Sequence, residues 1–131
     1  MRVFTLIVLF LSGLSFLGFG LALTIAPISV LADIDVTVSG AIADTEIRAF
    51  YGGLELALGA LILAWTINPA RRRDALLLTA VSYGGIGLMR LGSMLATGDD
   101  AFFLRFAVAT ELGFLIAAAF LYWRQPQPAK P

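Results

Sequence analysis

Four long apolar stretches, separated by short polar or proline-containing segments, dominate the pattern of hydrophobic and polar positions along this chain. Each stretch is close to the roughly 20 residues that an α-helix needs to cross the hydrocarbon core of a bilayer. We therefore predict an all-α membrane protein, in which four transmembrane helices form one bundle within a single domain, residues 1–124. The predicted spans cover about residues 3–26, 47–67, 75–96 and 101–123.

The first apolar stretch has a competing interpretation as a secretory signal peptide. Arg2 precedes it, and Val30-Leu31-Ala32 resembles a cleavage site. The apolar region of a signal peptide is, however, only about 7–15 residues long, and this stretch is far longer. We therefore expect a retained transmembrane helix.

Residues 27–45 form the longest connection and contain aspartates but no lysine or arginine. Within it, residues 33–40 alternate between polar and apolar side chains, as a short strand does. This pattern predicts a short structured outer loop after the first helix. Residues 125–131 are polar and rich in proline, which predicts a disordered tail.

The composition supports the membrane class and narrows the chemistry. Hydrophobic residues make up 60% of the chain and charged residues 14%, whereas roughly a quarter of residues are charged in soluble domains. The chain has no His and no Cys, so it offers no imidazole or thiolate ligand for zinc, haem or an iron–sulfur cluster. Its one Lys, Lys130, lies in the tail, which excludes a Schiff base within the bundle. We expect no metal and no cofactor.

Basic residues predict the orientation of the spans. Arg2, residues 71–73, Arg124 and Lys130 all fall at one side of the predicted bundle, whereas the two connections at the other side carry only acidic charges. The positive-inside rule therefore places both termini in the cytoplasm. Three consecutive arginines are too few for a polybasic lipid site, so we interpret them as a topology signal and expect no nucleic-acid partner.

Five charged side chains lie inside the apolar stretches: Arg48, Glu55, Arg90, Arg105 and Glu111. A charge at the centre of a span costs about 2.5–3.5 kcal/mol, against a gain of about 0.3–0.6 kcal/mol for each Leu, Ile or Phe. Such side chains persist where they are paired, hydrated or functional. With a rotation of about 100° and a rise of about 1.5 Å per residue, Arg48 and Glu55 share one helix face. Glu55, Arg90 and Glu111 lie at similar depth.

These charges allow two interpretations. Glu55, Arg90 and Glu111 form either a network that only locks the helices together or the lining of a polar pocket open to the outer side. Three arginines face two glutamates on the spans, so either a ligand anion or Glu46 completes the charge balance, or one of the glutamates titrates with a raised pKa. The candidate ligand-binding residues are Arg48, Tyr51, Glu55, Tyr83, Arg90 and Glu111.

Six glycines on the spans are expected to permit close helix packing. They lack the strand–turn–helix context of a nucleotide-binding loop. These glycines are Gly13, Gly20, Gly52, Gly59, Gly84 and Gly87.

The start of the second span carries a distinctive sequence, Glu46-Ile-Arg48-Ala-Phe-Tyr51-Gly52-Gly53-Leu-Glu55, followed by Gly59, an arginine late in the third span and a glutamate in the fourth. Through its Arg-x-x-Tyr-Gly-Gly-x-Glu core the chain resembles a bacterial family of small four-helix membrane proteins known only as a domain of unknown function. It resembles the DoxX-like membrane proteins more loosely. The resemblance implies the four-helix fold and a place in the bacterial cytoplasmic (inner) membrane, but no activity.

Three functional hypotheses follow. The first is an integral membrane protein that binds a small amphipathic or anionic, lipid-like ligand in the outer half of the bundle. The second is a non-catalytic accessory subunit of a larger membrane complex, or a homo-oligomer, that docks through its glycine-rich faces. The third is an intramembrane enzyme acting on a lipid or isoprenoid, with Glu55 and Glu111 as acid and base. Because the sequence shows no recognised nucleophile or metal site, we favour a protein that is not an enzyme.

Overall fold

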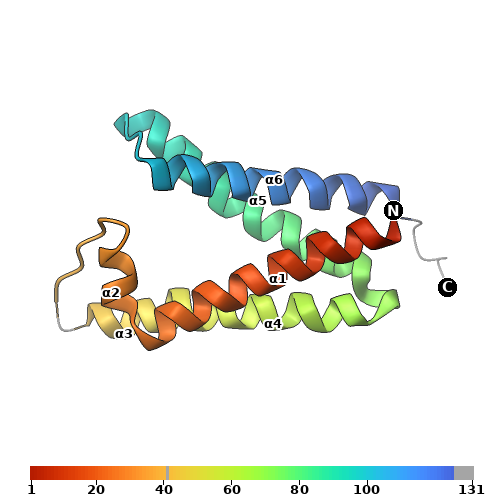
Figure 1. Cartoon of the computed structure of the whole chain (residues 1–131), viewed down its shortest axis with the longest axis horizontal. Coiled ribbons are helices and arrows are strands. Elements are labelled where there is room, and N and C mark those ends of the chain that lie inside the picture. The colour runs from red at the N-terminus through yellow and green to blue at the C-terminus, as the bar shows by residue number, and fades with distance from the viewer. Residues whose placement is uncertain (41, 126–131) are drawn as a thin grey trace. The chain divides into compact units, whose positions relative to one another are not determined.

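The computed structural model of the protein describes residues 1–40 and 42–125, and its regular structure is helical throughout these residues. No β-strand occurs among them, which confirms the predicted all-α class. The helices, drawn in Figure 1, are α1 (Arg2–Ile25), α2 (Pro27–Ala32), α3 (Ala43–Ile47), the π-helix η1 (Arg48–Gly53), α4 (Leu54–Ile67), the 3₁₀-helix η2 (Pro69–Arg71), α5 (Arg72–Thr97) and α6 (Phe102–Arg124).

Four helical stretches within the described residues are long and apolar enough to cross a membrane, as the sequence predicts. They are Arg2–Ile25, Ala43–Ile67, Pro69–Thr97 and Phe102–Arg124. The second begins four residues earlier than expected, because α3 runs directly into η1 and α4. Asp44 and Glu46 lie in the first turn of α3, where carboxylates interact favourably with the helix dipole. The orientation of the termini stays a prediction.

The strand-like alternation of residues 33–40 does not correspond to a strand in the structure. Pro27 occupies the first turn of α2, where the fixed φ and missing N–H of proline are tolerated. The chain then turns back, and the backbone N–H groups of residues 34–36 donate to the carbonyls of Leu31 and Ala32. With no second strand to complete a ladder, these donors are satisfied by the end of a helix instead. The predicted disordered tail lies outside the described residues, except for Gln125.

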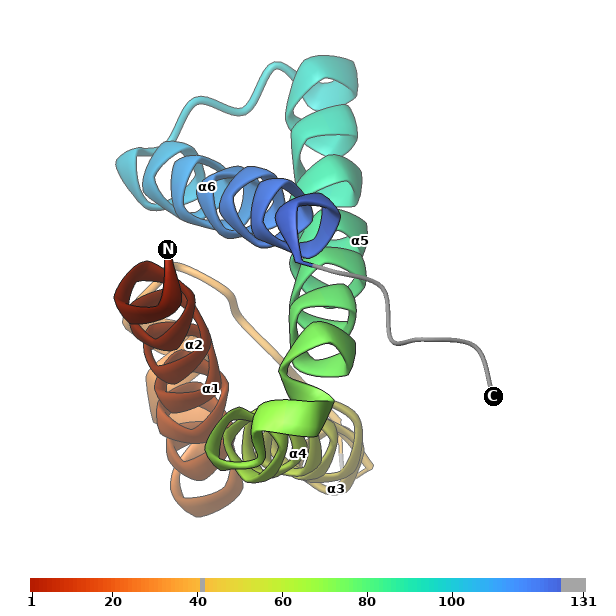
Figure 2. The ribbon, with the colours of Figure 1, turned by 90° about the vertical axis from the view of Figure 1, so that its right-hand side faces the viewer.

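The described residues form two compact units. One comprises residues 10–64, and the other comprises residues 1–9 together with the chain from Trp65 onwards. In the first unit, α1 lies alongside α4 (Figures 1 and 2). In the second unit, α5 packs against α6, as Figure 2 also shows.

Glycines bring the backbones of α1 and of the helix that continues through η1 into α4 close together. A Cβ atom added to Gly20 would lie 2.6 Å from the backbone nitrogen of Leu56, and one added to Gly59 would lie 2.8 Å from the carbonyl oxygen of Gly13. A Cβ on Gly52 would lie 2.5 Å from Thr24 Oγ1. These distances are shorter than van der Waals contact, so a side chain at any of these positions would force the neighbouring atoms to shift.

The α5–α6 pair is built in the same way. A Cβ on Gly87 would lie 2.9 Å from the Cβ of Glu111, and one on Gly84 would lie 3.0 Å from Leu115 Cδ1. Together with the contacts of α1 and α4, this confirms the packing role predicted for Gly13, Gly20, Gly52, Gly59, Gly84 and Gly87.

We predict that Gly20→Ala destabilises the protein and that Gly18→Ala does not. Gly18 lies two residues away on the same helix, but a Cβ there would meet nothing within 4 Å. The added methyl group at Gly20 must push α1 away from α4, and overpacking of this kind costs about 1–3 kcal/mol. Unfolding of the purified protein in mixed detergent micelles, followed by circular dichroism, measures the difference. Equal stability of the two variants would contradict the close-packing role of Gly20.

Candidate functional site

The six candidate residues are divided between the two units. Arg48, Tyr51 and Glu55 lie on the Ala43–Ile67 stretch of the first unit, and Tyr83, Arg90 and Glu111 lie on α5 and α6 of the second.

Arg90 and Glu111 form a closed ion pair between α5 and α6. Arg90 Nε lies 3.1 and 3.0 Å from the two carboxylate oxygens of Glu111, and a terminal guanidinium nitrogen lies 2.9 Å from Oε1. The Glu111 side chain is only 11% exposed and that of Arg90 30%. Two-pronged geometry of this kind is the strongest form of the arginine–carboxylate interaction. For these two residues, the structure supports the predicted contact and its locking role.

Gly87 allows this pair to form. Its missing side chain leaves room for the Cβ of Glu111, and Arg90 follows three residues later, so both lie on the same face of α5. Tyr83, one turn before Gly87, is buried, and its ring lies 4.7 Å from the ring of Phe114 at an interplanar angle of 30°. Tyr83 is therefore part of the α5–α6 packing interface.

Arg48 connects the start of the second span to the end of α1. Its guanidinium donates to both carboxylate oxygens of Asp44, at 2.7 and 3.3 Å. It also donates to the backbone carbonyls of Thr24 and Ile25. The last carbonyls of a helix lack partners within the helix and lie at the negative end of its dipole. Arg48 therefore satisfies the C-terminus of α1 while its own charge is balanced by Asp44.

The π-helix η1 begins at Arg48 and ends at Gly53. Its wider turn holds more residues than an α-helical turn, and each extra residue rotates the following side chains by about 100°. The shared face predicted for Arg48 and Glu55 assumed an unbroken α-helix and does not apply across this segment. Gly52 faces Thr24 of α1, whereas Tyr51 is 59% exposed. Glu55 follows in the first turn of α4 and is half-buried.

Two aspartates that lie in the predicted connections form ion pairs with arginines on the spans. Asp44 pairs with Arg48, and Asp100 lies 3.3 Å from Arg105 Nε. The first pair has the four-residue spacing at which side chains meet on a helix. The sequence did not predict this pair, because the predicted span began after Asp44. Arg48, Arg90 and Arg105 thus each have a carboxylate partner within the protein, so none of them needs a ligand anion to balance its charge.

No group of three or more His, Cys, Asp or Glu side chains in the described part of the chain is arranged to hold a metal ion. The arrangement offers ion pairs, one tyrosine hydroxyl on an exposed face and one half-buried carboxyl group. These groups suit hydrogen bonding to a polar head group.

We predict that the Arg90–Glu111 pair behaves as a unit. Arg90→Met alone or Glu111→Leu alone leaves one charge at membrane depth without its partner, and each should lose about 3 kcal/mol, the lower end of the range for breaking a buried pair. The double variant should recover to within about 1 kcal/mol of wild type, because apolar residues can replace a buried ion pair. Unfolding in mixed micelles measures all three.

Arg105→Gln serves as the control, because its pair with Asp100 is exposed and such pairs contribute about 0–1 kcal/mol. Strictly additive losses in the double variant would show that Arg90 and Glu111 act independently.

Comparison of the chain with known proteins identifies its family. No curated protein and no solved structure matches the chain. The looser similarity to DoxX-like proteins stays a prediction. It also stays a prediction that the Arg-x-x-Tyr-Gly-Gly-x-Glu core is characteristic of the family. Residues 4–122, which include almost all of the four long helical stretches, match the family described as a domain of unknown function (DUF4345). The chain therefore belongs to this family of unknown function, as its resemblance predicted.

Proposed function

We propose that this protein is a small multi-pass membrane protein that binds a small amphipathic molecule from the bilayer, with the polar head group of that molecule at Tyr51 and Glu55. The observation that carries the proposal is the π-helix η1, Arg48–Gly53, inside the second membrane-spanning stretch. π-Helical turns are rare and are found frequently at functional sites.

The two sides of η1 differ in a way that suits a binding site. On one side, Arg48 and Gly52 contact the end of α1 and fix the wide turn in place. On the other side, Phe50 and Tyr51 are exposed, at 67% and 59%. One side of the π-helical turn is therefore fixed to the end of α1, and the other side is exposed to molecules of the bilayer.

The chemistry of this face favours a head group that donates hydrogen bonds, such as a hydroxyl or an amine. A carboxylate has about four acceptor positions, so Glu55 can accept from a ligand in addition to its contacts within the protein. The Tyr51 hydroxyl both donates and accepts. The exposed side chains of Phe50 and Leu54 offer apolar surface for a hydrocarbon tail.

An anionic head group and a catalytic role are less well supported. Arg48 and Arg90, the arginines expected to bind an anion, already have carboxylate partners. An acid–base mechanism needs Glu111, whose two carboxylate oxygens both face the Arg90 guanidinium. For the accessory-subunit hypothesis, the exposed apolar side chains of the spans suit lipid as well as a partner helix, so no observation favours it.

We predict that a lipid-like molecule co-purifies with the wild-type protein and is lost from Glu55→Gln. Losing a hydrogen bond to a charged group costs about 1.5–3 kcal/mol, which corresponds to a drop in affinity of about 10-fold to 150-fold. Tyr51→Phe removes a neutral hydrogen bond of about 1 kcal/mol, so its affinity should fall about fivefold. Native mass spectrometry of the protein released from gentle detergent, with lipidomics of the bound fraction, measures both.

Glu46→Gln is the matched control, because it removes the same charge from an exposed position on the same helical stretch. It should retain the wild-type ligand. Identical bound molecules in wild type, Glu55→Gln and Tyr51→Phe would refute the proposed site.

A further inference from the structure

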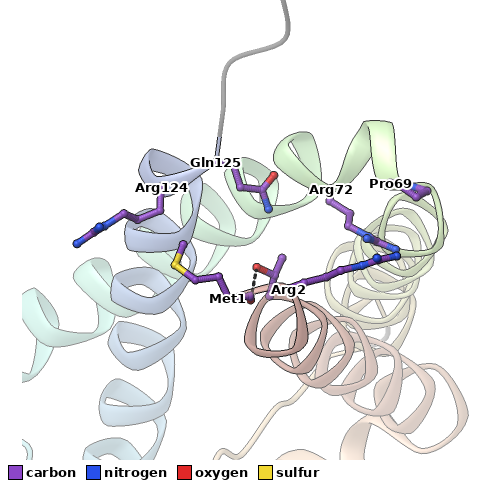
Figure 3. Close-up of a pocket in the computed structure, with 7 residues that line it drawn as sticks. Met1, Arg2, Pro69, Arg72, Arg124 and Gln125 are labelled. Atoms are coloured by element: carbon purple, nitrogen blue, oxygen red, sulfur yellow. Dashed lines mark hydrogen bonds between the residues drawn. The ribbon is translucent and has the colours of Figure 1, made fainter.

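A cavity of about 260 Å³ lies in the second unit, where the start of α1, the turn before α5 and the end of α6 meet (Figure 3). Three of its seven lining residues are arginines and none is acidic. They are Met1, Arg2, Thr5, Pro69, Arg72, Arg124 and Gln125. The charged side chains that line the cavity are therefore all cationic.

The guanidinium groups of Arg2 and Arg72 point toward one another beside Pro69, whereas Arg124 extends in the opposite direction (Figure 3). Arg72 is held in place because its Nε donates to the carbonyl of Thr66 at 2.9 Å. Among the described residues, the ion pairs involve other arginines, namely Arg48, Arg71, Arg90 and Arg105. Arg2 and Arg72 therefore line the same cavity without taking part in any of these ion pairs.

We propose that this cavity binds the phosphate group of an anionic phospholipid head group. The planar fork of a guanidinium matches phosphate oxygens, and two such forks converge here. The cavity is smaller than the about 300–1,000 Å³ of sites that enclose a drug-sized ligand. It therefore suits a head group, with the acyl chains left among the surrounding lipids.

The position of the cavity favours a lipid as the source of the phosphate. α1 and α5 begin here, and α6 ends here, so the cavity lies at the level where spans meet head groups. The positive-inside prediction places this end at the cytoplasmic leaflet, whose anionic lipids attract arginine and lysine. Three consecutive arginines by themselves fall short of a lipid site, but at this cavity the fold adds Arg2, from a distant part of the chain, to Arg72.

The test is a titration of the purified full-length protein with phosphatidylglycerol, phosphatidylcholine or inorganic phosphate, with bound molecules counted by native mass spectrometry. Wild type should bind phosphatidylglycerol more tightly than phosphatidylcholine. Affinity for phosphatidylglycerol should fall roughly fivefold in Arg2→Gln or Arg72→Gln, and about thirtyfold in the double variant. Binding of phosphatidylcholine, whose phosphate is balanced by its choline group, should fall by less. Arg2→Gln serves as a second readout if Arg72→Gln, which loses the contact with Thr66, unfolds.

Arg71→Gln is the matched control. This variant removes one charge from the same end of the helices, but Arg71 is paired with Asp74 at 3.2 Å and does not line the cavity. The affinity of Arg71→Gln for phosphatidylglycerol should therefore stay within about twofold of wild type. If millimolar inorganic phosphate displaces the lipid from wild type but binds poorly to the double variant, the cavity binds free phosphate from solution. That result would overturn the assignment of a lipid as the ligand. Equal affinity for both lipids in wild type, or a loss in Arg71→Gln as large as in the double variant, would overturn the proposal.

Discussion

Close approach of helix backbones is the constraint on which each half of this protein depends. Between helices in a bilayer there is little hydrophobic driving force, because lipid tails are as apolar as leucine. Stability must come from van der Waals packing and from polar contacts, and both require short distances. At Gly20 and Leu56, and again at Gly87 and Glu111, the absence of one Cβ atom brings two helices together.

The polar contacts depend on that packing. Arg90 reaches both carboxylate oxygens of Glu111 because Gly87 admits the Cβ of Glu111 to the surface of α5. Arg48 reaches the last carbonyls of α1 where Gly52 meets Thr24. A charge in a span costs several kcal/mol unless it is paired, so the glycine contacts and the ion pairs stabilise the same interfaces. This coupling explains why charged residues and glycines occur close together in the sequence.

The features that the sequence predicted are those set by local composition. Span length follows from runs of apolar residues, and the six packing glycines follow from their places on those runs. The depth of Arg90 and Glu111, counted along two helices, indicated that they could meet. The π-helix η1 could not be predicted, because it rests on contacts between Arg48, Gly52 and the end of α1. Likewise, the strand-like alternation after Pro27 does not produce a strand, because alternation alone does not supply a pairing partner.

The arginines of the described residues are held in two ways, by carboxylates or by aromatic rings, and this difference affects what each can bind. The carboxylates of Asp44 and Glu111 occupy the in-plane N–H groups of Arg48 and Arg90. At the opposite ends of α5 and α6, Arg73 stacks on Tyr122 at 3.9 Å and Arg124 lies over Phe120 at 5.1 Å. Stacking on an aromatic ring positions the face of a guanidinium but leaves N–H donors at its edge available. The exposed Arg2 and Arg124 therefore keep N–H donors for water or for phosphate oxygens, whereas Arg90 already uses its Nε and one terminal nitrogen on Glu111.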